Sequence, residues 1–176
     1  MTGPSPRLDP AALTDYGPWP APRPHTAPEL ARLLALVEDR GVRGGSVALG
    51  HGRDAASRAA AAAFADAWQE RGGQLVAVVD WPEDAASWLR QARRLTDPQP
   101  DAWVVAAAPV GWVQLSRRLR HSTDWDPRRT FGFAATGDTR LVTAAGPGVL
   151  DGMRGATPEG RVWTVVRGWV VESAEA

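Results

Sequence analysis

The sequence predicts a three-layer α/β domain, Rossmann-like or flavodoxin-like, with a parallel five-stranded sheet in the order 2-1-3-4-5. Two observations lead to this prediction. Between residues 45 and 136, short and almost wholly apolar runs alternate with longer segments whose apolar residues recur at helical spacing. Such runs are typical of parallel strands that helices cover on both faces. The first run is short, apolar and flanked by helices, which places it at the centre of the sheet.

Five apolar runs are the predicted strands, and they cover residues 46–50, 74–79, 102–108, 131–136 and 162–171. Gly168 marks a break within the last of them. Helices are predicted between the strands: one capped by Asp54 that ends near Arg71, and three over residues 83–95, 109–121 and 139–145. The segment 146–160, rich in glycine, is predicted to be mostly irregular.

The chain divides into a proline-rich N-terminal extension, residues 1–26, a single α/β domain, residues 27–171, and a tail, residues 172–176. Proline removes a backbone donor and fixes φ, so the extension is expected to be extended or irregular. Within it, residues 8–19 are expected to dock as one short turn, with Tyr16 and Trp19 covering part of the domain.

A capping box predicts the first helix of the domain. Thr26 is the cap, Pro28 lies in the first turn, and Glu29 stands three positions after the cap. Gly41 is expected to end this helix.

Composition narrows the classes of partner and chemistry. Basic and acidic residues number 20 each, so a formal net charge of zero argues against a nucleic-acid partner or an anionic membrane. The absence of lysine excludes Schiff-base chemistry, and the absence of cysteine excludes disulfides and thiolate zinc sites. The lack of Lys, Ile and Asn indicates a GC-rich bacterial genome. No apolar signal region and no run of about 18 apolar residues occur, so a cytoplasmic protein is expected.

One stretch carries a family resemblance, and it begins SVALGHGRDAASRAAAAAFADAWQERGGQLVAVVDW and continues to PDAWVV. A first strand leads into the polar loop 51–54, then a helix with a Gly72-Gly73 stop, a second strand, and a third strand that starts at Pro100-Asp101. This pattern resembles the second lobe of type I periplasmic-binding proteins, of the branched-chain amino-acid receptor kind, over roughly residues 45–167.

The resemblance implies a role. Proteins of that family bind ligand in a cleft between two lobes, whereas this chain has room for one lobe and no recognisable signal peptide. We therefore expect a non-enzymatic module for ligand sensing or protein contact, with no cofactor.

The candidate ligand site lies at the carboxyl ends of the strands, where open parallel sheets bind their ligands. The side chains expected there are His51, Arg53, Asp80, Trp81, Trp112 and Asp138. Arg53 would pair with a carboxylate, the helix that begins after Asp54 favours an anion, and a tryptophan would stack on the ligand. The alternative is that these polar residues are merely solvated.

The sequence gives little support for a dinucleotide site or a metal site. Gly50-His51-Gly52 lacks the third glycine of a dinucleotide fingerprint, and no His/Asp/Glu trio has metal-ligand spacing. The second hypothesis for function is a small α/β enzyme, or a subunit of one, with His51 as acid/base.

Nine tryptophans are present. Trp68, Trp88, Trp103 and Trp112 fall on faces between helix and sheet and are predicted to be core residues. Trp19, Trp81, Trp125 and Trp169 have no burial pattern. They mark either a dimer or partner surface or a surface that the N-terminal extension covers, and a homodimer or a protein partner is predicted.

Overall fold

The computed structural model describes residues 6–42 and 45–173, which contain a seven-stranded sheet in the order β2-β1-β3-β4-β5-β6-β7. Strands β1 to β5 pair in parallel, and β6 and β7 are antiparallel. The strands are β1 (Ser46–Gly52), β2 (Gln74–Trp81), β3 (Ala102–Ala106), β4 (Thr130–Gly132), β5 (Arg154–Ala156), β6 (Val162–Val166) and β7 (Trp169–Ser173).

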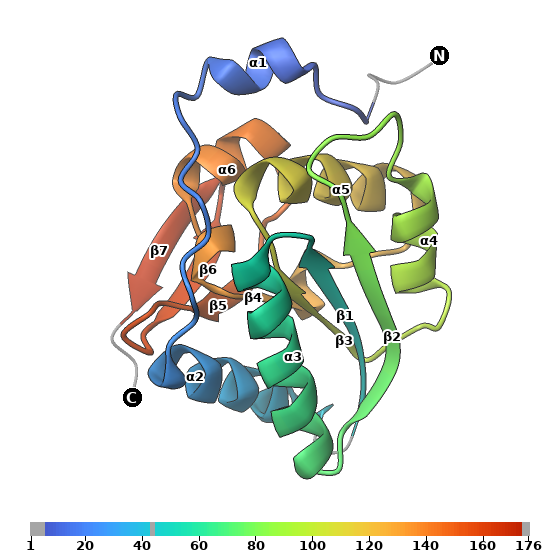
Figure 1. The fold of residues 1–176 in the computed structure, drawn as a ribbon, viewed down its shortest axis with the longest axis vertical. Helices are drawn as coiled ribbons and strands as arrows, with labels where there is room; N and C mark the ends of the chain where they lie inside the picture. Colours follow the sequence, from blue (N-terminus) through green and yellow to red (C-terminus); the bar gives the residue numbers. More distant parts are fainter. Residues whose placement is uncertain (1–5, 43–44, 174–176) are drawn as a thin grey trace.

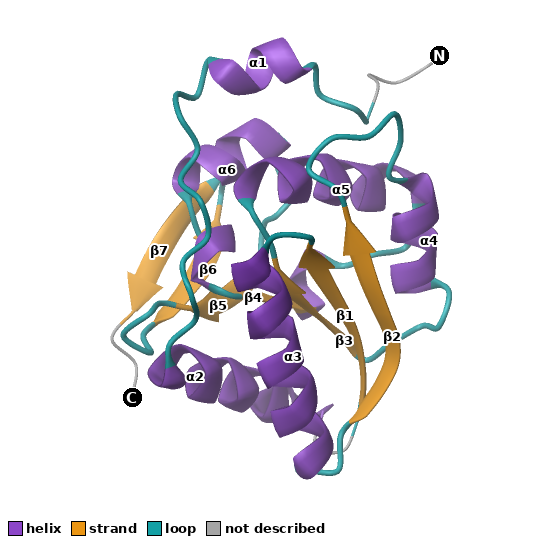
Figure 2. Ribbon diagram, viewed as in Figure 1, coloured by secondary structure: helices purple, strands orange, loops and turns teal. Residues whose placement is uncertain are grey.

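Helices cover both faces of this sheet, as Figures 1 and 2 show. One apolar core lies between the sheet and α2 and α3, and a second lies between the sheet and α4, α5 and α6. The helices are α1 (Pro10–Thr14), α2 (Ala27–Val37), α3 (Ala55–Glu70), α4 (Leu89–Thr96), α5 (Pro109–Ser122) and α6 (Thr139–Ala145). Short helical turns follow α2 (Glu38–Val42) and flank β4 (Pro127–Arg129 and Ala134–Thr136). The predicted three-layer α/β class is therefore confirmed.

The prediction of a parallel five-stranded sheet is wrong, although the first four strands lie in the predicted order. Residues 162–171 do not form one strand, because the chain reverses at Arg167 and Gly168, whose φ angles are 50° and 81°. Two successive positive φ angles are typical of a tight hairpin turn, and Val166 accordingly pairs with Trp169. The fifth parallel position belongs to β5, a three-residue strand inside the segment that was expected to be irregular.

The helix predicted from residue 83 begins only at Leu89. Residues 82–88 form a loop because their polar groups bind elsewhere. Glu83 Oε2 accepts a hydrogen bond from Gly111 N at 2.7 Å, at the start of α5, and Trp88 Nε1 donates to Pro82 O at 3.2 Å. This loop therefore ties the end of β2 to the start of α5, the helix that follows β3.

The capping box at the start of α2 is confirmed: Glu29 N donates to Thr26 Oγ1, and Thr26 N donates to the Glu29 carboxylate, both at 3.2 Å. Gly41 has a φ of 77° in the short helical turn that follows α2, the left-handed conformation in which helices commonly end.

The N-terminal extension packs on the domain. Gln114 of α5 holds the backbone of Leu8 through two hydrogen bonds, of 2.9 and 2.8 Å. Tyr16 and Trp19 pack against the apolar core that includes residues of α4, α5 and α6, as expected. The Arg140 guanidinium lies 5.5 Å from the centre of the Trp19 ring. Residues 15–25, which we call the strap, then run along one side of the molecule from α1 to α2 (Figure 1).

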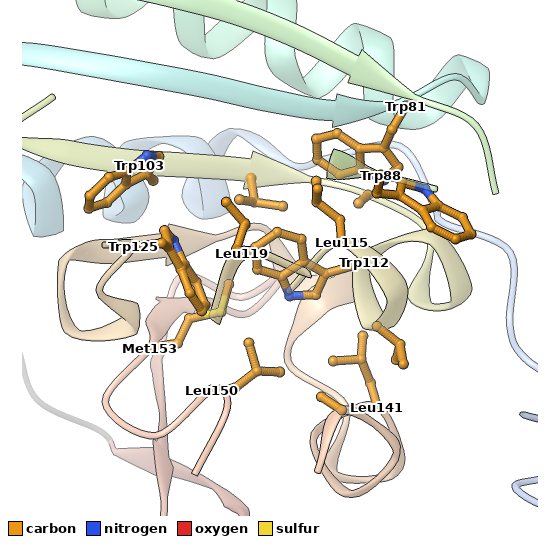
Figure 3. Close-up of a cluster of buried hydrophobic side chains, with 14 of the residues drawn as sticks. Trp81, Trp88, Trp103, Trp112, Leu115, Leu119, Trp125, Leu141, Leu150 and Met153 are labelled. Carbon is orange, nitrogen blue, oxygen red and sulfur yellow. The ribbon is translucent and has the colours of Figure 1, made fainter. Parts of the chain in front are cut away.

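All of the tryptophans except Trp19 and Trp169 are buried. The four that were predicted as core residues are confirmed. Trp81 and Trp125, for which no burial pattern was found, are buried as well, and they pack on either side of Trp112 at ring distances of 6.1 and 6.0 Å (Figure 3). These two side chains therefore cannot form a partner surface. Trp169 is 67% exposed and Trp19 is half-buried.

Candidate functional site

The sheet has a topological switch point between the carboxyl ends of β1 and β3. From β1 the chain continues into α3 on one face, and from β3 it continues into α5 on the other face. The two connections diverge, and a crevice between such connections is where open α/β sheets bind ligands. A pocket of about 350 Å³ lies at this point.

The pocket has walls from four parts of the chain. The strap contributes residues 20–25, the first turns of α3 contribute a second wall, and the ends of β3 and β4 contribute the others. The lining residues include Pro20, Pro22, Arg23, Pro24, His25, Glu29, Ala56, Ser57, Ala60, Ala106, Ala107, Pro109, Phe133 and Ala134. Because most of these side chains are alanine or proline, the space at the switch point is not filled.

Two polar groups in these walls have unused hydrogen-bonding capacity. Ser57 is 2% exposed, and its Oγ finds no partner among the described residues. The same holds for His25 Nδ1, whose ring packs edge-on against Phe133. Glu29, another polar residue of the lining, is satisfied: its carboxylate accepts from Thr26 N at 3.2 Å and from Ala134 N at 2.7 Å. A buried polar group without a partner is costly, so Ser57 and His25 mark the positions where a ligand would bind.

A second unpaired oxygen lies beside Ser57. Asp54 caps α3 through Oδ1, which accepts from Ser57 N at 2.8 Å, while its Oδ2 is buried and has no partner among the described residues. A methyl group added at Gly52 would lie 2.9 Å from that Oδ2 and 3.5 Å from Ser57 Oγ. Two hydrogen-bond acceptors, one of them charged, therefore lie next to each other around Gly52.

Two acidic groups, Asp54 and Glu83, interact with each other near this point. Burial raises the pKa of Glu83, the hydrogen bond from Gly111 lowers it, and the negative charge of Asp54 raises it again, with a net increase. Glu83 Oε1 is also buried without a partner among the described residues. This corner of the site therefore favours a positively charged group.

The structure brings three of the six predicted site residues together. Arg53 Nη2 lies 3.2 Å from Asp80 Oδ1 in an exposed ion pair, and His51 is the half-buried neighbour of Asp80 across β1 and β2. His51 Nδ1 lies 2.8 Å from the Gly52 carbonyl oxygen. These residues lie at the predicted end of the sheet, but they do not line the pocket.

The other three do not join that group: the rings of Trp81 and Trp112 are buried in the core, and Asp138 lies at the start of α6. Trp81 and Trp112 are 0% exposed and pack on each other in the core beneath α5, so neither ring offers a surface on which a ligand could stack. The apolar periodicity of α5 already placed Trp112 on its buried face. Asp138 caps α6 and pairs with Arg140 at 2.9 Å. These contacts with Arg140 outweigh burial and lower the pKa of Asp138.

Sequence reasoning missed Ser57 and His25. The signal for Ser57 is its place on the buried face of α3, in the first turn of a helix that follows a strand. His25 lies in the proline-rich extension, where no local pattern points to a site. Only the path of the strap brings it to the strand ends.

Within residues 6–42 and 45–173, no three His, Asp or Glu side chains gather in a way that could hold a metal ion. Among the helices of the same residues, none has the length and apolarity needed to cross a membrane.

Residues 13–164 match the family model described as periplasmic binding protein, so the chain belongs to this family. No curated protein matches the chain. Among solved structures, it is similar to a putative branched-chain amino acid ABC transporter from Rhodospirillum rubrum, at 22% identity and a TM-score of 0.62. That match covers 73% of this chain and 36% of the other.

Two further solved structures are similar to the chain over part of their length. The protein Rp1789 of Rhodopseudomonas palustris has 16% identity and a TM-score of 0.64, and the match covers 84% of this chain and 39% of Rp1789. A substrate-binding periplasmic protein from Ralstonia solanacearum has 14% identity and a TM-score of 0.64, with coverages of 81% and 40%. At these identities the likeness concerns the fold, and the chain spans well under half the length of these proteins.

The expectation of a cytoplasmic protein is wrong. The family is that of periplasmic binding proteins, and a similar structure from Rhodopseudomonas palustris is described as an extracellular ligand-binding receptor. The family match confirms the resemblance to periplasmic-binding proteins on which the first of the two function hypotheses rests.

Proposed function

We propose that this protein binds a small aliphatic molecule with an ammonium group in the pocket at the switch point. The observation that carries the proposal is the pair of unpaired oxygens, Ser57 Oγ and Asp54 Oδ2, beside a pocket of about 350 Å³. Both atoms accept hydrogen bonds, and an ammonium group donates three. The ligand would thus satisfy oxygens that the protein leaves unpaired.

The apolar part of the ligand follows from the walls. Alanine and proline side chains line most of the pocket and offer apolar contact without hydrogen bonds. Branched-chain amino acids are the first probes, because the Rhodospirillum rubrum structure is described as a putative branched-chain amino acid ABC transporter. The observation specific to this chain is the combination of small apolar walls with acceptors at one end.

The chain acts in this proposal as a single ligand-sensing lobe that contacts a second copy or another protein. The outer face of the β6–β7 hairpin supports a contact surface, since Val166, Trp169 and Val171 are all exposed there. No contact of His51 favours the alternative of an enzyme, because its Nδ1 faces the Gly52 carbonyl and its ring lies outside the pocket.

Isothermal titration calorimetry tests the proposal with L-leucine, its deaminated analogue 4-methylpentanoate, and its decarboxylated analogue 3-methylbutylamine. L-Leucine should bind at least tenfold more tightly than 4-methylpentanoate, because leucine has the ammonium group that satisfies both acceptors and 4-methylpentanoate has none. Asp54→Asn keeps a good helix cap and should weaken leucine binding about tenfold, as should Ser57→Ala. Asp97→Asn, at the exposed end of α4, is the matched control.

Equal affinity for leucine and 4-methylpentanoate would contradict the ammonium site. If none of the three compounds binds the wild-type protein at millimolar concentration, the proposed function itself is wrong.

A further inference from the structure

We infer that the outer face of the β6–β7 hairpin binds a second copy of this chain in a twofold dimer, in which Trp169 of each copy packs against Arg154 of the other. This inference rests on the proposed function, because it names the partner of the contact surface proposed there. It involves no residue that lines the ligand pocket.

The hairpin exposes a continuous row of apolar side chains. Residues directly opposite each other in an antiparallel pair share one face of the sheet, and the register places Val166 beside Trp169 and Thr164 beside Val171. We call residues 164, 166, 169, 171 and 173 the hairpin face, and none of them is charged. Val166, Trp169 and Val171 are 47%, 67% and 50% exposed.

The charged residue of β7 lies on the other face. Glu172 is opposite Trp163, whose side chain is part of the core with α4, α5 and α6, and it pairs with Arg161 at 3.1 Å. In an antiparallel sheet the solvated face is normally the polar one. Here the apolar residues point to water instead, which indicates that another molecule covers the hairpin face.

The hairpin face is exposed because the helices on its side of the sheet do not reach it. There α3 packs on β1, β2 and β3, and α2 packs on β4 and β5, whereas β7 is the edge strand (Figure 1). Val162, at the other end of β6 on the same side, is still buried in the core with α2 and α3. The hairpin face therefore continues that apolar core outward.

Three hydrogen bonds hold the hairpin in place. Gly168 N donates to Asp151 Oδ1 at 3.0 Å, Val165 N to Met153 O at 2.8 Å, and Val170 N to Thr139 Oγ1 at 3.3 Å. A surface that is already ordered loses little conformational freedom on association. The bond to Thr139 also occupies a backbone donor of the edge strand, so a partner packs on the face rather than adding a strand beside β7.

A second copy supplies groups that match this surface. Arg154 of β5 lies beside Thr164 on the same side of the sheet, is half-buried, and has no ion pair among the described residues. The Trp169 ring has no aromatic or cationic neighbour among them either.

A guanidinium binds well over an indole ring, and each copy offers one of each. A twofold dimer uses the same patch on both copies, so a twofold axis that lies in this face can pair each Trp169 with Arg154 of the other copy. The uncharged hairpin face adds no repulsion between the copies.

Sedimentation velocity of the full chain, from about 1 to 100 µM, tests the contact. The wild type should dimerise within this range. Val171→Thr keeps the shape of the side chain and should weaken the dimer about tenfold, since the substitution occurs twice in a twofold dimer. Val78→Thr is the matched control, because Val78 lies on the opposite edge strand, β2, with a nearly equal exposure of 49%, and it should leave the dimer unchanged.

A double-mutant cycle tests the pairing of Arg154 with Trp169. Arg154→Gln should weaken the dimer about tenfold, again because two contacts are lost. Trp169→Leu keeps an apolar side chain without the aromatic ring, and in that background Arg154→Gln should have no further effect. Arg90→Gln on the exposed face of α4 is the control, because Arg90 also has no ion pair among the described residues. Equal effects of Arg154→Gln in both backgrounds would refute the pairing.

Cross-linking locates the contact directly. The chain has no cysteine, so a single introduced thiol is unambiguous. A bismaleimide with a short spacer should join two copies of Val166→Cys, and it should leave Val78→Cys monomeric. Equal cross-linking of both variants would overturn the hairpin face as the contact.

The outcomes separate this inference from ligand binding. If the wild type stays monomeric at 100 µM, or if Val171→Thr and Val78→Thr weaken the dimer equally, the inference is wrong, and leucine binding in the calorimeter is unaffected. If the dimer forms as described but no ligand binds, the proposed pocket fails and the inference stands.

Discussion

The two faces of the sheet are packed with side chains of very different size. Between the sheet and helices α4, α5 and α6, the core contains Trp81, Trp88, Trp103, Trp112 and Trp125 (Figure 3). Trp163 belongs to the same core. Between the sheet and helices α2 and α3, the core consists mainly of Leu, Val and Ala, and Trp68 is its one tryptophan among the described residues. The two cores lie on opposite faces of the sheet, and both extend to the carboxyl ends of its parallel strands.

This difference decides where a ligand can enter. On the tryptophan face, a methyl group added at Gly50 would lie 2.7 Å from the Trp81 ring, so no space remains there. On the opposite face, Ala56, Ala60 and Ala106 leave the pocket of about 350 Å³. A switch point thus has two sides, and side-chain volume determines which of them stays open.

The largest expected effect comes from the filled face. Trp112→Ala should lower the free energy of unfolding by about 3–5 kcal/mol, because it leaves a cavity between Trp81 and Trp125. Urea denaturation followed by circular dichroism measures the loss. Leucine affinity under native conditions should stay within about twofold of the wild type, and a larger change would show that the two faces are not independent.

Filling the open face should abolish binding with little loss of stability. Ala56→Leu places a large side chain in the pocket from the first turn of α3, and leucine affinity should fall at least 100-fold. Ala62→Leu, on the exposed side of the same helix, controls for helix propensity and should bind as the wild type does. Calorimetric titration of both variants distinguishes steric exclusion from a general effect on α3.

The stability of the protein should depend on pH through Glu83, which bonds to the start of α5. Its folded-state pKa is raised, so the folded protein binds this proton more tightly than the unfolded chain does. The bound proton therefore stabilises the folded protein at pH values below 4.5, the ordinary pKa of the carboxyl group. This stabilisation is lost as the pH rises through the raised pKa of Glu83. Glu83→Gln should therefore raise the melting temperature by roughly 1–3 °C at pH 7 and by less at pH 4. An equal shift at both pH values would contradict the cause given for the raised pKa.

The smallest effect is expected at the exposed tryptophan. Trp169→Thr on the β6–β7 hairpin should change the free energy of unfolding by no more than about 0.5 kcal/mol, since the side chain is 67% exposed. Analytical ultracentrifugation of the same variant addresses the predicted association. If the wild type is a dimer and this variant is not, the hairpin face is the contact. If both are dimers, the contact lies elsewhere.

Parts of the fold could be predicted because their signals are local. The capping box of Thr26 and Glu29 lies within four residues, and the run at 46–50 is recognisable as a buried strand from its own composition. The end of the chain could not be predicted in the same way. Arg167 adopts a positive φ that a non-glycine residue seldom takes, so the hairpin was not evident, and β5 is a strand of only three residues.

The candidate site at the carboxyl end of the sheet stays a prediction, and the structure shows how its predicted side chains are placed. The strand-end rule placed Trp81 and Trp112 at the rim, whereas both rings turn into the core. His51, Arg53 and Asp80 do lie at the strand ends, and their role in binding stays a prediction. Ser57 and His25 belong to the site only because α3 and the strap meet there.

The sequence by itself determined the alternation of strands and helices, the start of α2 and the apolar surfaces that the helices bury, because spacing and capping act over a few residues. The tertiary structure alone decided the mixed sheet, the burial of Trp81 and Trp125, and the path of the strap over the switch point. Those features depend on contacts such as that between Leu8 and Gln114, 106 residues apart along the chain. Local patterns carry no information about such a pair, so the pocket and its cover appear only when the chain is folded.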